Sequence, residues 1–245
     1  MSVLARAALI VGAFGVDEPF LGVSDLSRRT GLAKATVHRL ATELCTVRVL
    51  ERSEAGGAYR LGSWLFELGE MVPHHRSLAE AAQPIMEDLL EATHERIHLA
   101  VLDGVDVVYV KILGGRSVSV ASREGGRLPA HATGVGKVIL AYSPEAAVRS
   151  RIEAGLPRLT PRTVATPGTL GRELQKIRDA GLGMDREESH LGVSCVAAPV
   201  FGADGHVRAG LSITGPTRSV DPAKLGPAVR TAALTLSRVL RQSGL

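Results

Sequence analysis

The segment His94-Glu95-Arg96-Ile97-His98 has the H-E-x-x-H spacing of zinc hydrolases, in which two histidines hold the metal and a glutamate is the general base. That chemistry requires both histidines on one face of a continuous helix, with a third ligand further along the chain. Here a helical stripe ends at Leu90 and a strand-like alternation begins at Leu99, which separates the two rings. His131 or His190 is available as third ligand, but the spacing requires neither. A zinc hydrolase using His94, Glu95 and His98 is therefore an unfavoured alternative, and we expect no bound metal.

Cys195 together with His131 or His190 offers a nucleophile and a base. Cys195 lies within the apolar run 193–200, however, which is typical of an inert, buried thiol. The sequence has no G-x-S-x-G nucleophile elbow. Its two cysteines form no disulfide framework, as expected of a protein in a reducing cytoplasm. We predict a protein that is not an enzyme and that needs no cofactor.

A third pattern, Gly134-Val135-Gly136-Lys137, leads from a small-residue loop into a helix, where free N–H groups favour a carboxylate. It is not a phosphate-binding P-loop, because His stands at position 131 and Val at position 138, where that motif needs Gly and Ser or Thr. We interpret this segment as the start of a binding site for a small organic anion.

Two helices and a hairpin are predicted between residues 23 and 61. Ser24 is the expected cap of a first helix, which Gly31 ends in a left-handed conformation. A second helix is expected from about Ala33 to Leu44, because residues 37, 40, 41 and 44 give one apolar stripe. Residues 49–52 and 58–61 then form a hairpin. This order of elements is that of a winged helix-turn-helix.

Residues 28 to 60 contain seven Lys or Arg and three Glu, a surplus of four positive charges that equals the formal charge of the whole chain. The outward face of the second helix fits the major groove, and basic residues of the hairpin reach the neighbouring backbone. Aromatic residues make up only 3%, which disfavours single-strand binding by base stacking. The predicted DNA-contacting residues are Arg28, Lys34, Ala35, Thr36, His38, Arg39, Thr42, Arg52 and Arg60.

Helices and strands interleave in the rest of the chain, which indicates an α+β domain with a central antiparallel sheet. A linker helix over 62–72 is expected to stop at Pro73, and Ser77 with Glu80 forms a capping box for the next helix, which Pro84 kinks or restarts. Strands are predicted over 97–102, 107–113, with a turn at Asp103-Gly104, and over 117–122, 195–201 and 206–214. Helices are predicted over 134–142, 144–154 and 169–180, and after the cap Asp221.

The N-terminal segment allows two interpretations, a signal peptide or a buried helix. Arg6 followed by residues 7–16 resembles a short signal peptide, but the apolar residues also have helical spacing, and the second helix needs a packing partner. We therefore expect a buried helix. No apolar run approaches the roughly 18 residues of a membrane span.

The segment 24–40, SDLSRRTGLAKATVHRL, resembles the signature of the isocitrate lyase regulator (IclR) family, as does Tyr59-Arg60-Leu61-Gly62. The blocks 128–137, 192–200 and 211–216 are similar to that family in the same order. The resemblance covers nearly the whole chain. It implies bacterial transcription regulators, often repressors, that form dimers or tetramers and carry a GAF-like effector-binding domain.

The resemblance also implies a pocket for a small organic acid or aromatic compound. Its polar groups would be Gly134, Val135, Asp185, Cys195 and Ser212, and its apolar walls would be Val120, Leu128 and Val193. The alternative is that Cys195 and Ser212 have only a structural role, as small strand residues in a packed core. In one departure from the family's acidic run, Arg186 adds a positive charge that we expect beside the mouth of the pocket.

Together these features predict a winged helix-turn-helix domain over residues 1–62, a linker helix over 63–75, and an effector-binding and oligomerisation domain over 76–245. We expect a cytoplasmic homo-oligomer that binds a near-palindromic double-stranded operator under control of a small molecule, with no membrane partner. The alternative is a ligand sensor that acts through protein contacts.

Overall fold

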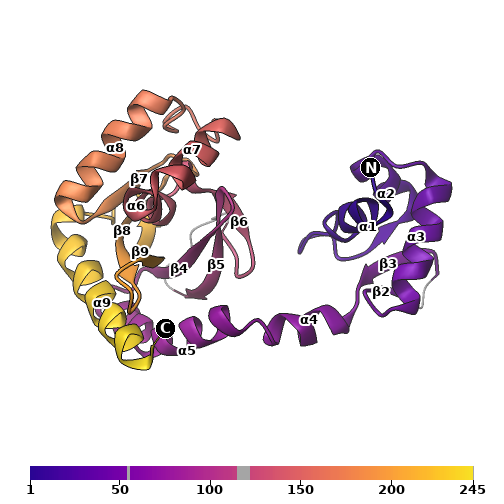
Figure 1. Cartoon of the computed structure of the whole chain (residues 1–245), viewed down its shortest axis with the longest axis horizontal. Helices are drawn as coiled ribbons and strands as arrows, with labels where there is room; N and C mark the ends of the chain where they lie inside the picture. The colour runs from indigo at the N-terminus through magenta and orange to yellow at the C-terminus, as the bar shows by residue number, and fades with distance from the viewer. Residues whose placement is uncertain (54–55, 115–121, 245) are drawn as a thin grey trace. The chain divides into compact units, whose positions relative to one another are not determined.

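The computed structural model describes residues 1–53, 56–114 and 122–244 (Figure 1). The chain divides into two compact units, Met1–Pro73 and His74–Leu245. Each unit has its own hydrophobic core and is described by itself. The described part of the chain contains no helix that is both long and apolar enough to cross a membrane.

The first unit is a three-helix core with a small antiparallel sheet, the arrangement predicted for a winged helix-turn-helix (Figure 1). The sheet has the strand order β1-β3-β2. Ile10, Leu26 and Leu40, one from each of the first three helices, are buried in a common core. The elements are α1 (Val3–Val11), β1 (Leu21–Gly22), α2 (Val23–Thr30), α3 (Lys34–Thr46), β2 (Leu50–Arg52), β3 (Ala58–Leu61) and α4 (Ser63–Glu70).

Local details of the first unit both confirm and correct the sequence-based expectations. Gly31 ends α2 with φ of +70°, as predicted. The prediction that Ser24 caps α2 was wrong, because the N-cap is Gly22, two residues earlier, and the helix begins at Val23. Asp25 instead accepts a hydrogen bond from the Gly22 N–H at 3.4 Å. Strand β1 was not predicted, since two residues are too few to show an alternation.

The second unit begins with a long helix, α5 (Pro73–Thr93). The expected capping box at Ser77 was wrong, because the helix starts at Pro73, and proline is well suited to a first helical turn. Pro73 therefore opens α5, while α4 has already ended at Glu70. Pro84 lies inside α5, which continues as one helix, so the expected restart does not occur.

A six-stranded antiparallel sheet forms the centre of this unit, with the order β6-β5-β4-β9-β8-β7, and confirms the predicted α+β class (Figure 1). The strands are β4 (Arg96–Asp103), β5 (Asp106–Leu113), β6 (Arg127–Pro129), β7 (Gly183–Arg186), β8 (Val193–Phe201) and β9 (Val207–Pro216). The turn after Asp103 contains Gly104 with φ of +64°, as predicted. The strand predicted over 117–122 falls on residues 115–121, which lie outside the described residues.

Helices cover both faces of the sheet. α5 and α9 (Pro222–Ser243) bury their apolar sides with Leu99, Val196 and Leu211 on one face. The other face packs against α6 (Gly134–Tyr142) and α8 (Pro167–Ala180) through Ala100 and Ala197. Successive strand residues thus point to opposite faces, as the period of two requires. The remaining helices are α7 (Glu145–Glu153) and a short 3-10 turn, η1 (Ala130–Ala132), just before α6.

Candidate DNA interface and ligand pocket

Helix α3 presents two distinct faces. Val37, Leu40 and Ala41 are buried in the core of the first unit. The opposite side exposes a basic and polar surface made of Lys34, Ala35, His38 and Arg39, with Thr36 and Thr42 partly exposed. A helix with one anchored face and one polar face is what insertion into a major groove requires. The structure therefore brings six of the predicted DNA contacts onto one helix.

The predicted arginine contacts are exposed but already have local partners. Arg39 pairs with Glu43 at 2.6 Å along α3, and Arg28 pairs with Asp25 at 2.8 Å along α2. On the hairpin, Arg60 pairs with Glu51 at 2.7 Å. Exposed ion pairs of this kind contribute only about 0–1 kcal/mol each. A phosphate or a guanine edge can therefore replace the carboxylate at small cost.

Arg52 connects the hairpin to α3. It donates a hydrogen bond of 3.0 Å to the Thr42 hydroxyl, and its guanidinium lies 5.5 Å from the centre of the Tyr59 ring. Tyr59 is buried in the core of the unit. This contact holds one cation of the hairpin beside Thr42 of α3.

A buried polar pocket lies in the second unit, between the sheet and the start of α6. It brings together six of the predicted effector contacts, namely Leu128, Val135, Asp185, Val193, Cys195 and Ser212. Gly134 lies directly behind Cys195, since a Cβ atom at position 134 would come within 2.5 Å of the Cys195 sulfur. Val120 lies outside the described residues. Sequence reasoning missed the other lining residues, which are His98, Tyr109, Ser122, Thr133, Ser189, His190 and Thr214.

Sheet register explains why some of these residues were missed. His98 stands opposite Ser212 in the β4–β9 pair, and its Nδ1 lies 3.1 Å from the Thr214 hydroxyl. The Tyr109 ring packs edge-on against the His98 ring, with centroids 5.2 Å apart. Only the order of strands reveals these neighbours. Thr214 is the exception, because a polar residue two positions after Ser212 must share its face.

The electrostatics of the pocket are dominated by one carboxylate. Burial raises the pKa of Asp185 to about 6, although hydrogen bonds from Ser189 and from the Glu188 N–H oppose the shift. Burial lowers the pKa of His98 to about 3, so this ring is neutral. Burial also raises the pKa of the Cys195 thiol to about 12 and that of Tyr109 above its ordinary value. The pocket thus offers one acidic acceptor, neutral hydroxyl groups and a protonated thiol.

These values bear on the catalytic alternatives. A thiol that remains protonated at neutral pH is a poor nucleophile. In the H-E-x-x-H segment, α5 ends at Thr93, His94 adopts a positive φ of 57°, and Arg96 begins β4. The continuous helix that zinc ligation needs is therefore broken between the two histidines, as predicted. Within the described ranges, no group of three or more His, Cys, Asp or Glu side chains is placed to hold a metal ion.

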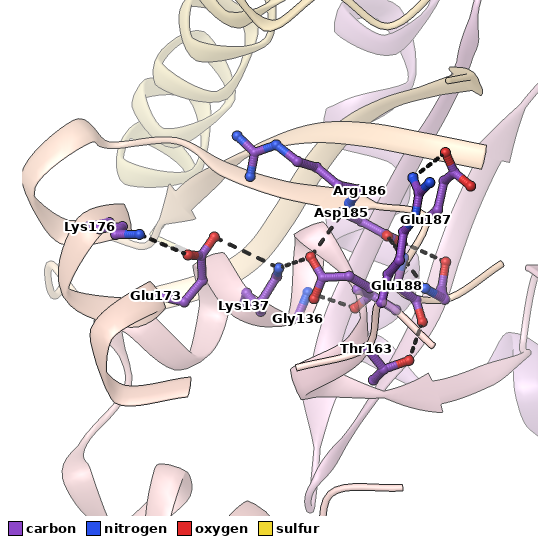
Figure 2. Close-up of polar contacts among 12 residues, drawn as sticks. Gly136, Lys137, Thr163, Glu173, Lys176, Asp185, Arg186, Glu187 and Glu188 are labelled. Carbon is purple, nitrogen blue, oxygen red and sulfur yellow. Dashed lines mark hydrogen bonds and ion pairs between the residues drawn. The ribbon is translucent and has the colours of Figure 1, made fainter. Parts of the chain in front are cut away.

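Beside the pocket lies a buried ion pair that the sequence did not indicate (Figure 2). Lys137, one turn into α6, is fully buried and contacts the carboxylate of Glu188, which is also buried. The Glu188 N–H donates to Asp185 at 2.6 Å, and Thr163 donates to the Glu188 carbonyl at 2.6 Å. The pair therefore fixes the loop after β7, and with it Asp185, against α6.

Arg186 is not where we expected it. Asp185 is buried on the pocket side of β7, whereas its neighbour Arg186 is exposed and lines a different cavity. Because successive strand residues point to opposite faces, the predicted charge beside the pocket mouth is placed on the other side of the strand.

A winged helix with a basic, exposed reading helix, in one chain with an α+β unit that holds a buried polar pocket, defines a ligand-binding transcription regulator. The chain belongs to the IclR family. Residues 3–54 match the IclR helix-turn-helix domain, and residues 71–238 match the C-terminal domain of bacterial IclR transcriptional regulators.

Individual relatives agree with this assignment. The chain is 35% identical to the HTH-type transcriptional regulator XynR of Escherichia coli, over 96% of this chain and 95% of the relative. It is 30% identical to the transcriptional repressor AllR of the same species, over 89% of this chain and 82% of the relative. The crystal structure of an IclR homologue from Microbacterium hydrocarbonoxydans, complexed with 4-hydroxybenzoate, has a TM-score of 0.86 and 32% identity, over 98% of this chain and 100% of that chain.

Proposed function

We propose that this regulator is a repressor that binds a near-palindromic operator as a dimer or tetramer and responds to a small organic acid or hydroxylated aromatic compound. The observation that carries the proposal is the combination, in one chain, of the exposed polar face of α3 with the buried pocket around Asp185. A single reading helix makes few base contacts, so two symmetry-related helices are needed for specific binding.

On the DNA side, the proposal assigns base contacts to the middle of α3 and phosphate contacts to the surrounding cations. Arg39 and His38 lie on the exposed face where base edges would be reached. Lys34 lies at the first turn of α3, where backbone N–H groups also favour a phosphate. Arg52 and Arg60 on the hairpin would bind the backbone outside the groove. A cytoplasmic location follows from this partner.

On the ligand side, the proposal matches each polar group of the pocket to a feature of the effector. The first N–H groups of α6, at Gly134 and Val135, favour a carboxylate. Asp185 accepts a hydrogen bond from an effector hydroxyl, and Leu128 and Val193 give apolar walls. The relative crystallised with 4-hydroxybenzoate supports this class of compound, which carries a carboxylate, an apolar ring and a hydroxyl.

The effector can control operator binding only through a difference in its affinity for two states of the protein. The pocket is built from residues of all six strands of the sheet and from the first turn of α6, so occupancy acts first on the packing of α6 against the sheet. We propose that this change alters the arrangement of subunits, and hence the spacing of the two reading helices.

The test is fluorescence anisotropy of the full-length protein on DNA from upstream of its own gene, across a salt series. Arg39→Ala is expected to weaken operator binding about 5- to 150-fold, since one specific base contact contributes about 1–3 kcal/mol. The matched control is Arg149→Ala, which removes an exposed arginine with the same i,i+4 pairing from α7 in the other unit. This control should leave the affinity within about twofold.

Three results would count against the proposal. Equal losses for the two variants would remove α3 from the interface. A salt-independent affinity would exclude phosphate contacts as its source. An effector such as 4-hydroxybenzoate that binds but leaves operator affinity unchanged would exclude the regulatory link.

A further inference from the structure

A second cavity lies on the opposite side of β7 from the effector pocket. Its volume is about 290 Å3, close to the lower end of the roughly 300–1,000 Å3 typical of small-molecule sites. β7 is an edge strand of the six-stranded sheet, and the cavity extends from this edge between α8 and the start of α9. None of its lining residues lines the effector pocket.

The cavity has an apolar floor and a cationic rim. Ile177, Leu182, Met184 and Val196 form the floor, and Ile177 and Val196 are almost completely buried. The rim carries two cations and one acid, which are Lys176, Arg186 and Glu173.

The two rim cations are available to a ligand. Lys176 is 77% exposed and only loosely paired with Glu173, at 3.9 Å. Figure 2 shows the Arg186 side chain extending away from the Glu188 cluster. Within the described residues, its guanidinium makes no hydrogen bond or ion pair. Two such cations above an apolar floor match a ligand with one anionic head and a short apolar body.

The acid on the rim does not cancel this preference. Glu173 is drawn inward by the buried ammonium of Lys137, whose Nζ lies 4.0 Å from the Glu173 Oε1. Lys137 is fully buried, so its charge is poorly screened and compensates nearby carboxylates effectively. The two cations of the rim thus outnumber the one acid that faces them.

A continuous line of charges joins the two cavities (Figure 2). It runs from Lys176 to Glu173, then to Lys137, and from there to Glu188, whose N–H donates to the effector-pocket carboxylate of Asp185 at 2.6 Å. An anion that binds Lys176 weakens the hold of Lys176 on Glu173. Glu173 then interacts more strongly with Lys137, in competition with Glu188.

We propose that the cavity between α8 and β7 is a second small-molecule site, which binds an amphipathic monocarboxylate. Arg186 and Lys176 hold the carboxylate, and the floor around Met184 takes the apolar body. Binding there weakens the Lys137–Glu188 pair and so changes the affinity of the effector pocket. This regulatory part rests on the proposed function, whereas the binding site itself does not.

The test uses hexanoate as probe and hexanamide, which has the same chain without the charge, as its control. Binding to the full-length protein is measured by isothermal titration calorimetry or ligand-observed NMR. Hexanoate is expected to bind at least about fivefold more tightly than hexanamide, and Arg186→Gln and Lys176→Gln should each weaken hexanoate about fivefold. Two control variants should change it by less than about twofold: Lys224→Gln, on exposed surface of α9, and Asp185→Asn, in the effector pocket.

Each other outcome overturns the proposal. Hexanoate that binds no better than hexanamide, or not at all, excludes the anion site. A change of more than about twofold in Asp185→Asn, most simply a gain because a like charge is removed, without a loss in Arg186→Gln places the ligand in the effector pocket instead. Operator binding is measured on the same samples, so the two proposals fail separately. If hexanoate does not bind but the operator does, only the second site is excluded. If hexanoate binds normally but the operator does not, only the regulator function is excluded.

Discussion

Replacing Asp185 with asparagine is expected to stabilise the second unit at neutral pH. Burial raises the pKa of Asp185 from its ordinary value of 3.8 to about 6 in the folded protein. At about 1.4 kcal/mol for each pH unit, the ionised side chain costs the folded state about 3 kcal/mol at pH 7.5. Asparagine carries no charge, and its carbonyl oxygen can still accept the N–H groups of Glu188 and Ser189, which both donate to Asp185 Oδ1.

The pH dependence gives the sign of the effect. Because the folded pKa is the higher one, the folded state of the wild-type chain binds more protons than the unfolded state between about pH 4 and pH 6. The contribution of Asp185 to the free energy of unfolding therefore falls as the pH rises through that window. Above the window the contribution is constant. The advantage of Asp185→Asn should be about 3 kcal/mol at pH 7.5 and about half of that at pH 5.

The assay is urea denaturation of both full-length proteins, followed by far-UV circular dichroism at several pH values. Trp64 lies in α4 of the first unit and is the chain's one tryptophan, so its fluorescence reports that unit separately and should not change. The reasoning is refuted if Asp185→Asn is destabilising at pH 7.5, or if its advantage is the same at all pH values. The same variant should bind the effector less well, because the acidic acceptor has been removed.

Three further predictions concern the neighbouring residues. Lys137→Met should cost about 3–5 kcal/mol of unfolding free energy, because it leaves Glu188 buried without its cation, and adding Glu188→Met should recover part of this loss in urea melts. Gly134→Ala should lower the melting temperature through a clash of about 1–3 kcal/mol with the Cys195 sulfur, and Cys195→Ala should relieve it. Arg52→Ala should reduce the slope of log affinity against log salt by about 1, and an unchanged slope would exclude a phosphate contact there.

The reading helix shows how far the sequence alone can go. The spacing of Val37, Leu40 and Ala41 determines which face of α3 is buried, and therefore leaves Lys34, His38 and Arg39 on the outside. This information is local, because a helix fixes its faces within a few residues. The same holds for the left-handed end of α2 at Gly31 and for the alternating strands of the sheet.

Element boundaries were predicted less well, since several residues compete for each terminus. Ser24 and Ser77 have side chains suited to capping, yet α2 begins at Val23, after the N-cap Gly22, and α5 begins at Pro73. A hydrogen bond to a neighbouring side chain, such as that from the Gly22 N–H to Asp25, is sufficient to move a helix start by two residues.

Only the tertiary structure decided the composition of the pocket and its charge. His98 meets both Tyr109 and Thr214 because β4 lies between β5 and β9, and no local pattern encodes that strand order. The burial of Lys137 depends on Glu188, 51 residues further along the chain, because an ammonium group enters the interior only where a carboxylate meets it. Local spacing thus determined which residues share a face, whereas long-range packing determined which faces meet and which charges are paired.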